Sequence, residues 1–430
     1  MDKLKIKHEE TKAIHSGWRS DATTNSVAVP IYQTTSYQFE NTEHAENLFA
    51  LKEIGNIYTR IMNPTCDVLE KRISAFEGGV ASLAVSSGQA ATALSIQNIA
   101  RNGDNIVSST DIYGGTWNLF ANTFKDQGIE VRFVDPSDPE NFENATDNKT
   151  RAYFGETLPN PKLDIFPIEE ISSIGRKIGI PLIVDNTAAP YICKPFAHGA
   201  SIVIHSTTKF VGGQGSAIGG IIVDGGNFQW EGFKTQQPAL NTADPSYHGV
   251  IWSEAAKPLG PIAYILKART TLLRDLGYAM SPFNAFQFIQ GIETLSLRIE
   301  RQSKNAEKLA NYLEKHDKVK KVIYPTLKKN KIIRDKYFTK HLYGNLIGFH
   351  LKEGFAACKK FIDSLQLFYH VANIGDVRSL AIHPSSTTHS QLSTQDQERA
   401  GVYKDYIRLS IGIEHEDDII SDIKNALEYI

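Results

Sequence analysis

The chain has 430 residues, a formal net charge of −2 and 41% hydrophobic residues, so it can bury a sizeable core. A nearly neutral charge offers no electrostatic footprint for nucleic acid or an anionic membrane, and we expect neither as a partner. No apolar run reaches the roughly 20 residues that span a bilayer, and the N-terminal segment lacks the apolar region of a secretory signal.

The predicted elements begin after a polar arm. Residues 1–64 are irregular and rich in turn-formers, and we expect them to form an N-terminal arm. From residue 65, short apolar runs alternate with segments of helical length such as 90–100 and 167–178. This alternation is typical of a largely parallel α/β sheet, which we expect over residues 65–269. The predicted strands are residues 82–85, 105–107, 130–134, 151–154, 181–184, 201–204 and 220–223.

The chain after the last of these strands has two parts. Residues 224–255 have the composition of a long loop, and a loop of this length is more often functional or interface-forming than idle. From about residue 270 the pattern is rich in helix, with an apolar stripe from Leu295 to Leu313 at helical spacing. Strands are predicted at 319–323, 346–351 and 406–411. We therefore expect a second, smaller α/β domain over residues 270–430.

A lysine follows the strand predicted at 201–204. It is Lys209, in the segment HSTTKFVGG that begins at residue 205. An ammonium group near an apolar wall loses solvation, so its pKa falls and it becomes available as an amine nucleophile or base. Ser206 and Thr208 can hydrogen-bond a phosphate beside it. The alternative is a surface lysine before a glycine turn, and the segment alone favours neither interpretation.

Polar residues follow other predicted strands, at the edge where parallel sheets bind ligands. Asp185 ends one strand, and its carboxylate can hold a pyridinium nitrogen protonated or simply cap a helix. In the segment VSSGQAA, the backbone of Gly88 and Gln89 can bind phosphate at a helix N-terminus, although such turns also serve packing. Tyr113, in DIYGGT, can stack on a flat ring or merely pack. Together with Lys209, these residues indicate a cofactor site.

These segments resemble the Cys/Met-metabolism family of pyridoxal phosphate (PLP) enzymes, from PIYQTTSY at residue 30 to IRLSIGIE at residue 407. The resemblance implies PLP as cofactor and an α/β fold of PLP-dependent fold type I, which is aspartate-aminotransferase-like. Within the family the chain is most similar to the O-acetylhomoserine sulfhydrylases, through HPSSTTHSQL from residue 383, the long segment after residue 224 and GIEHEDDII from residue 412. The implied reaction is γ-replacement, in which sulfide converts O-acetylhomoserine to homocysteine and acetate in methionine biosynthesis.

The resemblance implies a role for each residue of the cofactor site. Lys209 forms the Schiff base with PLP and carries the catalytic proton. Asp185 pairs with the pyridine nitrogen, Tyr113 stacks on the ring as a second catalytic residue, and Asn160 lies near the phenolic oxygen. The implied phosphate ligands are Gly88, Gln89, Ser206 and Thr208.

Other residues are implied to reach the substrate or a neighbouring subunit. Tyr58, a third catalytic residue, and Arg60 contact the phosphate bound by a neighbour, although Arg60 can also be read as an exposed arm residue. Arg408 clamps the α-carboxylate of the amino-acid substrate with Ser379 close by, and the alternative for Arg408 is a structural ion pair. Shared sites imply a homo-oligomer, and the family suggests a dimer of dimers.

Several activities stay open. A cystathionine γ-synthase or a methionine or cystathionine lyase of the same family is the nearest alternative. Gly115 stands where methionine γ-lyases typically carry a cysteine, which lowers the lyase interpretation without excluding it. A catalytically silent binding module is the alternative from another class, and the intact Lys209, Asp185, Tyr113 and Arg408 argue against it. The sulfur donor can be sulfide, methanethiol or a thiocarboxylate on a sulfur-carrier protein, and an acetyl or succinyl preference is open.

The remaining features are assigned no catalytic role. The odd number and wide spacing of the three cysteines favour reduced thiols in a cytoplasmic protein. The histidines are scattered and none forms HExxH, so we expect no metal site; four of them (His198, His205, His383 and His389) are interpreted as structural or pocket-lining. The turn after Asp185 is shorter than in many family members. Residues 224–255 are a candidate for closing the site against water.

Overall fold

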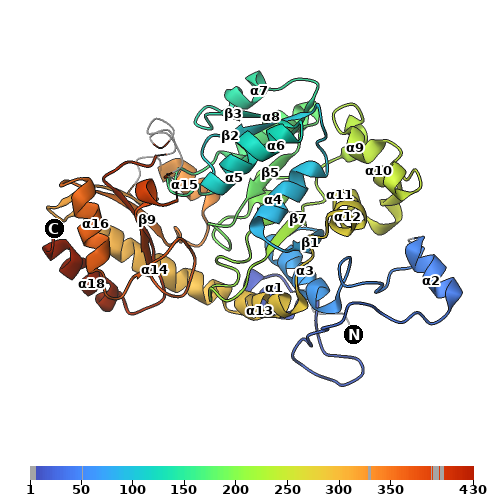
Figure 1. The fold of residues 1–430 in the computed structure, drawn as a ribbon, viewed down its shortest axis with the longest axis horizontal. Coiled ribbons are helices and arrows are strands. Elements are labelled where there is room, and N and C mark those ends of the chain that lie inside the picture. The colour runs from blue at the N-terminus through green and yellow to red at the C-terminus, as the bar shows by residue number, and fades with distance from the viewer. Residues whose placement is uncertain (1–5, 51, 328–330, 389, 391–396, 398–400) are drawn as a thin grey trace.

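The computed structural model describes residues 6–430 except 51, 328–330, 389, 391–396 and 398–400. Figure 1 shows a large central part built on one sheet, a smaller C-terminal part beside it, and an N-terminal arm that extends away from both. The arm contains α1 (Glu9–His15) and α2 (Thr42–Phe49). Contacts of α1 with α3 (Pro64–Glu77) and α13 (Pro282–Glu293) hold the start of the arm on the large part.

The large sheet has seven strands in the order β1-β7-β6-β5-β4-β2-β3. Four neighbouring pairs among β2 to β6 are parallel, and β7 runs antiparallel to both β1 and β6. The expectation of a largely parallel sheet is therefore confirmed. The strands are β1 (Ala81–Val85), β2 (Asn105–Ser109), β3 (Glu130–Val134), β4 (Thr150–Glu156), β5 (Leu182–Asp185), β6 (Ile202–His205) and β7 (Gly220–Asp224).

Helices cover both faces of this sheet. Successive strand residues enter different cores because side chains alternate across a strand: Leu182 and Val184 pack on one face and Ile183 on the other. The first face is covered by α3, α13 and α8 (Ile168–Ile178). The second is covered by α4, the α5–α6 segment and α11. Their bounds are α4 (Gly88–Gln97), α5 (Gly114–Asn118), η1 (Leu119–Thr123), α6 (Phe124–Asp126) and α11 (Ala263–Lys267), with α7 (Glu140–Asn144), η6 (Ala268–Leu273) and α12 (Arg274–Leu276) nearby in sequence.

The smaller part is built on a five-stranded sheet in the order β10-β11-β12-β9-β8. Its last strand along the chain, β12, lies in the middle, between β11 and β9. The strands are β8 (Val319–Ile323), β9 (Leu346–Leu351), β10 (Tyr369–His370), β11 (Leu380–Ile382) and β12 (Tyr406–Ser410). The helices are α14 (Leu295–Glu314), α15 (Lys331–Tyr337), α16 (Phe355–Ser364) and α18 (Glu416–Glu428).

The expected domain boundary at residue 270 falls inside the helical segment that runs from α11 to α12. This segment packs on the large sheet through η6 and β1, and α13 packs on α3. In contrast, α14 contacts β8, β9 and α18. The chain thus passes from the large part to the smaller one along α14, whose first turns still pack in the core of the large part through Leu295 and Ile299. The boundary at residue 270 stays a prediction.

The segment 224–255 folds against the side of the large part. Its short helices are η3 (Trp230–Phe233), α9 (Pro238–Asn241), η4 (Pro245–Tyr247) and α10 (Trp252–Ala255). Trp230 and Trp252 are buried in the core behind the sheet, and the Tyr247 hydroxyl donates a hydrogen bond to the Phe49 carbonyl at the end of α2. Figure 1 shows α9 and α10 on the side of the molecule away from the C-terminal part. The segment is thus an ordered outer layer rather than a free loop.

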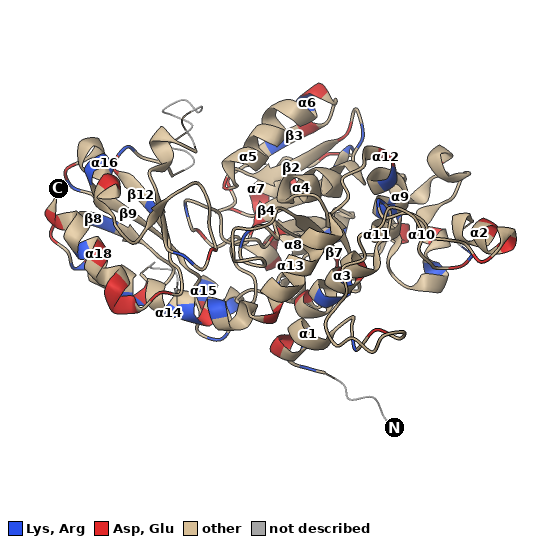
Figure 2. Cartoon of the chain, turned by 60° about the horizontal axis from the view of Figure 1, so that its bottom comes forward, with Lys and Arg blue, Asp and Glu red and all other residues tan. Residues whose placement is uncertain are grey.

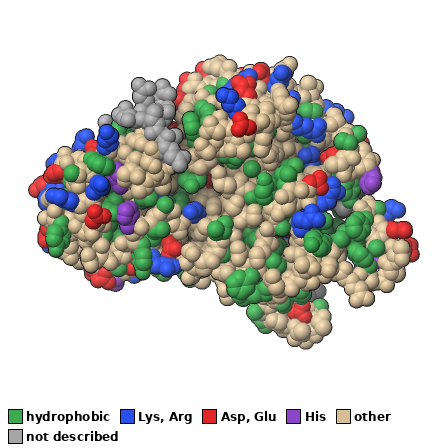
Figure 3. Space-filling view, viewed as in Figure 1, with side chains coloured by type: hydrophobic (Ala, Val, Ile, Leu, Met, Phe, Trp, Pro, Cys, Tyr) green, Lys and Arg blue, Asp and Glu red, His purple; other side chains and the backbone are tan. Residues whose placement is uncertain are grey.

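The surface carries charges of both signs, which Figure 2 shows interspersed over the two parts. Among the described residues, no helix has the length and apolar character needed to cross a membrane. Figure 3 shows apolar side chains gathered on one face where the arm and its surroundings lie. On the arm itself, Val27, Phe49 and Ile54 are strongly exposed.

Candidate active site

A cavity of about 270 Å³ opens at the carboxyl ends of the central strands, where the two parts of the chain meet. The large part contributes the ends of β4, β5 and β6 and the start of α4. The smaller part contributes β12 and the chain before β11. The polar lining includes Gly88, Gln89, Tyr113, Glu156, Asn160, Asp185, Thr187, Ser206, Thr208, Lys209, Asn373 and Arg408.

Lys209 lies in the turn after β6, held by its backbone. Its N–H donates to the Ser206 carbonyl at 3.1 Å, and its carbonyl accepts from Gly213 N–H at 2.8 Å. The Nζ atom donates to Asn373 Oδ1 at 2.7 Å. Burial, with the nearby Arg408 cation, lowers the pKa of Lys209 to about 8. The sequence expectation of a desolvated amine at this strand end therefore has a physical basis.

Asp185 ends β5, one strand away from Lys209. Its Oδ1 accepts from Thr187 N–H at 2.8 Å, so the side chain closes a short turn rather than capping a helix. Burial raises the pKa of Asp185. A cationic ring nitrogen placed against this carboxylate would offset the desolvation, which suits the implied pyridinium partner.

The start of α4 forms the opposite wall. Ser87 caps the helix by accepting from Ala90 N–H at 3.0 Å, and Gly88 and Gln89 follow in the first turn. A Cβ at Gly88 would lie 2.6 Å from Ser206 Cβ, so the close approach of the two segments requires glycine. The N–H groups of this turn are suited to a phosphate. The Thr208 hydroxyl already has two hydrogen bonds within the protein: it donates to the Gly219 carbonyl and accepts from the Gly219 N–H.

Arg408 enters the cavity from β12. Its Nη2 donates to the Asn373 carbonyl at 2.9 Å and its Nη1 reaches Asn160 Oδ1 at 3.4 Å. The Nε atom is buried without a hydrogen-bond partner, and no carboxylate of the described residues forms an ion pair with Arg408. Burial lowers its pKa to about 10. The structural ion pair considered from the sequence is therefore not formed with any carboxylate among the described residues.

The structure does not bring all predicted residues into the cavity. The Ser379 hydroxyl donates to Glu414 Oε2 at 2.9 Å and accepts from Gly412 N–H, and Ser379 is not among the lining residues. Tyr58 lies on the exposed arm with the Arg60 guanidinium 5.5 Å from its ring centroid. Neither residue lines the cavity of its own chain, so a contact with a neighbouring subunit stays a prediction.

The hypothesis that residues 224–255 close the site does not hold within one chain. None of these residues is among the described residues that line the cavity, because buried tryptophans fix the segment to another side of the sheet. The geometry therefore corrects this expectation for a single subunit.

Three of these polar lining residues, Glu156, Thr187 and Asn373, were missed from the sequence. Glu156 ends β4 beside Asp185, its register partner in the sheet, and the same strand-end rule that singled out Asp185 would have found it. Asn373 lies between β10 and β11 in the smaller part, and it contacts both Lys209 and Arg408. No local pattern marks such a loop residue, because the folded sheet alone brings it to the cavity.

The cysteines and the described histidines are not among the residues that line the cavity. All three cysteines are buried free thiols whose pKa values burial raises, so they are unreactive in this state. His205 is buried with Nε2 3.0 Å from Glu77 Oε1, and His198 and His383 are also absent from the lining. His389 falls outside the described residues. Among the described residues, no group of three potential metal ligands is placed to hold an ion.

Comparisons with known proteins identify the cofactor. The family model for the Cys/Met metabolism PLP-dependent enzymes matches residues 10–428. The chain belongs to this family. It is 54% identical over 98% of its length, and 97% of the relative, to an O-acetyl-L-homoserine sulfhydrylase of Leptospira meyeri. It is 50% identical to O-acetyl-L-homoserine sulfhydrylase 1 of Thermus thermophilus, over 97% of this chain and 99% of that one.

A solved structure gives the same result for the fold. The crystal structure of a protein assigned as an O-acetylhomoserine (thiol)-lyase from Campylobacter jejuni is 43% identical, with a TM-score of 0.94 over 98% of this chain and 100% of that one. That structure carries N'-pyridoxyl-lysine-5'-monophosphate. The expected fold and PLP as cofactor are thereby confirmed. The residues of the cavity fit PLP: an anion site at α4, a buried carboxylate and an amine of lowered pKa.

Proposed function

We propose that this PLP enzyme converts O-acetyl-L-homoserine and sulfide, or another small thiol, to L-homocysteine and acetate. The observation that carries the proposal is the presence, in one cavity, of the Lys209 amine and an Arg408 guanidinium that pairs with no carboxylate of the described residues. Several relatives at 44–54% identity bear names of this activity, including a homocysteine synthase from Schizosaccharomyces pombe. Both substrates are small molecules.

Residues of the cavity divide the work of holding PLP. Lys209 would bind it covalently, and Asp185 would keep the ring nitrogen protonated. Tyr113 and Asn160 would hold the ring. When bound, PLP would supply an electron sink for the bonds around the substrate Cα. Gly88 and Gln89 in the first turn of α4, with Ser206 and Thr208 in the turn after β6, would hold the phosphate.

Arg408 and Lys209 then act on the substrate. The Arg408 guanidinium holds the α-carboxylate and thereby fixes which face of the amino acid meets Lys209. The Lys209 Nζ atom, as a neutral amine, accepts the proton that leaves Cα. It would hand that proton on to the bound cofactor before accepting one from Cβ, because an amine holds only one added proton at a time. After sulfur has taken the place of acetate on Cγ, Lys209 returns one proton to Cβ and the other to Cα. The lowered pKa keeps this amine able to accept a proton near neutral pH.

A substrate panel tests the proposal. The purified holoenzyme is given O-acetyl- or O-succinylhomoserine, each with sulfide or cysteine, and the products are separated by chromatography. Homocysteine and acetate are expected from the acetyl ester with sulfide. Cystathionine as main product would replace the proposal by a cystathionine synthase, and 2-oxobutanoate without added thiol would replace it by a lyase.

The proposal includes an assembly. Tyr58 and Arg60 lie exposed on an arm that extends from the large part, and we assign them to the phosphate site of a neighbouring subunit in a dimer of dimers. We also place the enzyme in the cytoplasm, with its three cysteines as free thiols. A sulfur-carrier protein is an alternative sulfur donor, and replacing sulfide by a protein thiocarboxylate in the panel tests it.

A further inference from the structure

Glu156 is a buried carboxyl at the end of β4 that the proposed chemistry does not use. It is 7% exposed, and it lines the cavity between Asp185 and Tyr113. Its Oε1 accepts from Tyr113 N–H at 2.6 Å, and the backbone N–H of Asn160 donates to the same side chain. One carboxyl therefore holds the two loops that carry the predicted ring contacts.

The position of Glu156 is set by the sheet. It lies directly beside Asp185 in the parallel pairing of β4 with β5. Burial and the neighbouring Asp185 raise the pKa of Glu156 well above its ordinary range. Burying two carboxyls side by side costs free energy, because each loses its solvation and like charges repel. The hydrogen bonds that Glu156 accepts offset part of this cost.

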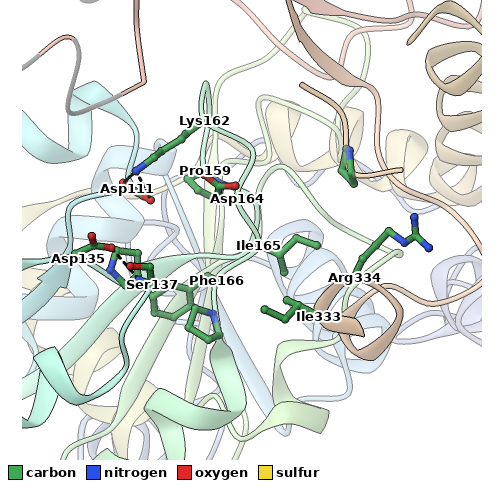
Figure 4. A pocket seen from close by; sticks show the side chains of 13 residues that line it. Asp111, Asp135, Ser137, Pro159, Lys162, Asp164, Ile165, Phe166, Ile333 and Arg334 are labelled. Atoms are coloured by element: carbon green, nitrogen blue, oxygen red, sulfur yellow. Dashed lines mark hydrogen bonds and ion pairs between the residues drawn. The ribbon is translucent and has the colours of Figure 1, made fainter. Parts of the chain in front are cut away.

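A second tie joins the same loops on the side away from the cavity. Lys162 Nζ lies 2.8 Å from Asp111 Oδ1 and 3.0 Å from Oδ2. Figure 4 shows Lys162 reaching across to Asp111 at the wall of a separate cavity of about 350 Å³. Asp111 precedes Tyr113 by two positions and Lys162 follows Asn160 by two. The two loops are thus fastened from outside by an ion pair and from inside by Glu156.

We propose that Glu156 is a positioning residue that sets Tyr113 and Asn160 against the ring of PLP. The inference rests on the proposed function only in assigning those two residues to the cofactor. The hydrogen bond from Tyr113 N–H to Glu156 fixes the backbone from which this half-exposed tyrosine reaches the cavity. Glu156 acts through these neighbours and does not touch the reacting atoms.

The test uses holoenzyme variants and is read without substrate. Glu156→Ala is expected to weaken PLP binding about tenfold and to reduce the induced circular dichroism of the bound cofactor, which reports ring orientation. Glu156→Gln keeps one acceptor oxygen for Tyr113 N–H but turns an amide donor toward the other N–H. It should fall between the wild type and Glu156→Ala in both measurements. Its milder change keeps the test valid if Glu156→Ala fails to fold.

Lys162→Ala is the matched control because it releases the same loops from the outer side. It should lower the unfolding midpoint while leaving the induced dichroism of PLP close to that of the wild type. Wild-type PLP affinity and dichroism in both Glu156 variants would overturn the inference, as would an equal loss in Lys162→Ala. A wild type that binds PLP but yields no homocysteine in the substrate panel would defeat the proposed reaction and leave this inference standing.

Discussion

Lys209 and Arg408 bring two cations into one cavity, and Asn373 contacts both. Each charge makes the other more costly, and burial adds to that cost. The two buried cations therefore favour deprotonation of Lys209 and binding of an anion by Arg408. In the proposed function, both changes would accompany the binding of PLP at Lys209 and of the amino acid at Arg408.

The lowered pKa of Lys209 predicts how PLP uptake depends on pH. Only the neutral amine attacks an aldehyde, and its fraction rises with pH until the pKa of about 8 is passed. The rate of PLP uptake by cofactor-stripped enzyme should therefore rise up to about pH 8 and then level off, as followed by absorbance. In Arg408→Ala one cause of the lowered pKa is gone, so the curve should move to higher pH. A rise that continued toward pH ~10.4, the value of a solvated lysine, would contradict the prediction.

Replacing Arg408 by lysine should weaken the binding of the amino-acid substrate. A lysine keeps the charge but loses the planar, two-point grip on a carboxylate. We expect kcat/KM for O-acetylhomoserine to fall roughly 100-fold, mainly through KM, as for a buried charge contact that is broken. Steady-state kinetics measure this, and Arg301→Lys on the exposed side of α14 is the control. An unchanged KM would remove Arg408 from the carboxylate site.

At the residue scale, the sequence predicted the groups that follow strands. Lys209, Asp185 and Tyr113 all line the cavity, as the rule for parallel sheets requires. Glu156 obeys the same rule and was overlooked. Ser379 was placed by resemblance, and the structure commits its hydroxyl to Glu414. Partners of that kind depend on side-chain packing, which a single sequence does not reveal.

At the scale of elements, α14 links the two parts of the chain and contacts the turn that contains Lys209. Arg298, buried on α14, donates to the carbonyls of Phe210 at 2.7 Å, Val211 at 3.1 Å and Gly291 at 2.7 Å. Because Phe210 and Val211 directly follow Lys209, this arginine anchors the turn that presents the amine to which we assign catalysis. The long helix thus supports the site from behind.

The substitution Arg298→Met should therefore lower the stability of the folded protein. Three buried carbonyls would lose a charged donor, and we expect the free energy of unfolding to fall by about 3 kcal/mol. Urea unfolding of the PLP-bound enzyme measures the change. Arg301→Met, on the exposed side of the same helix, should stay within ~0.5 kcal/mol of the wild type. Equal effects of the two substitutions would show that the carbonyl contacts are not the cause.

Most strands of the large sheet were predictable because they are apolar runs buried on both faces, whereas the edge strand β3 is only partly buried. The antiparallel direction of β7 was not anticipated. Residues 206–219 contain no helix, and a parallel connection needs a crossover that usually includes one. The short strands β10 and β11 and the helices of segment 224–255 escaped prediction for another reason. Their lengths are set by contacts with distant residues rather than by local pattern.

At the scale of the whole molecule, the exposed arm raises the question of a second subunit. Arg60 Nη1 donates to the Arg274 carbonyl, and the Arg274 guanidinium lies 5.7 Å from the Tyr247 ring centroid. The segment 224–255 therefore braces the arm near Arg60. If the arm completes a neighbour's phosphate site, this outer layer contributes to catalysis in the next subunit rather than in its own.

Mixing two inactive variants tests the sharing of sites. A Lys209→Ala subunit supplies an intact Arg60, and an Arg60→Ala subunit supplies an intact Lys209. After equal mixing and reassembly, about a quarter of all sites should combine both intact residues and recover activity. Each variant refolded alone is the control. No recovery in verified hetero-oligomers, or full activity of a monomer in sedimentation, would contradict shared sites.

The central place of β12 in its sheet has a consequence for biosynthesis. The smaller sheet cannot close between β11 and β9 until Tyr406–Ser410 has left the ribosome. The large sheet, in contrast, is complete once β7 has emerged, and domains generally fold as they appear. A nascent chain can thus form the side of the cavity that contains Lys209 well before Arg408 is in place. Cofactor capture can precede substrate recognition during synthesis, so a chain truncated before β12 should still retain the large sheet but not a grip on the amino acid.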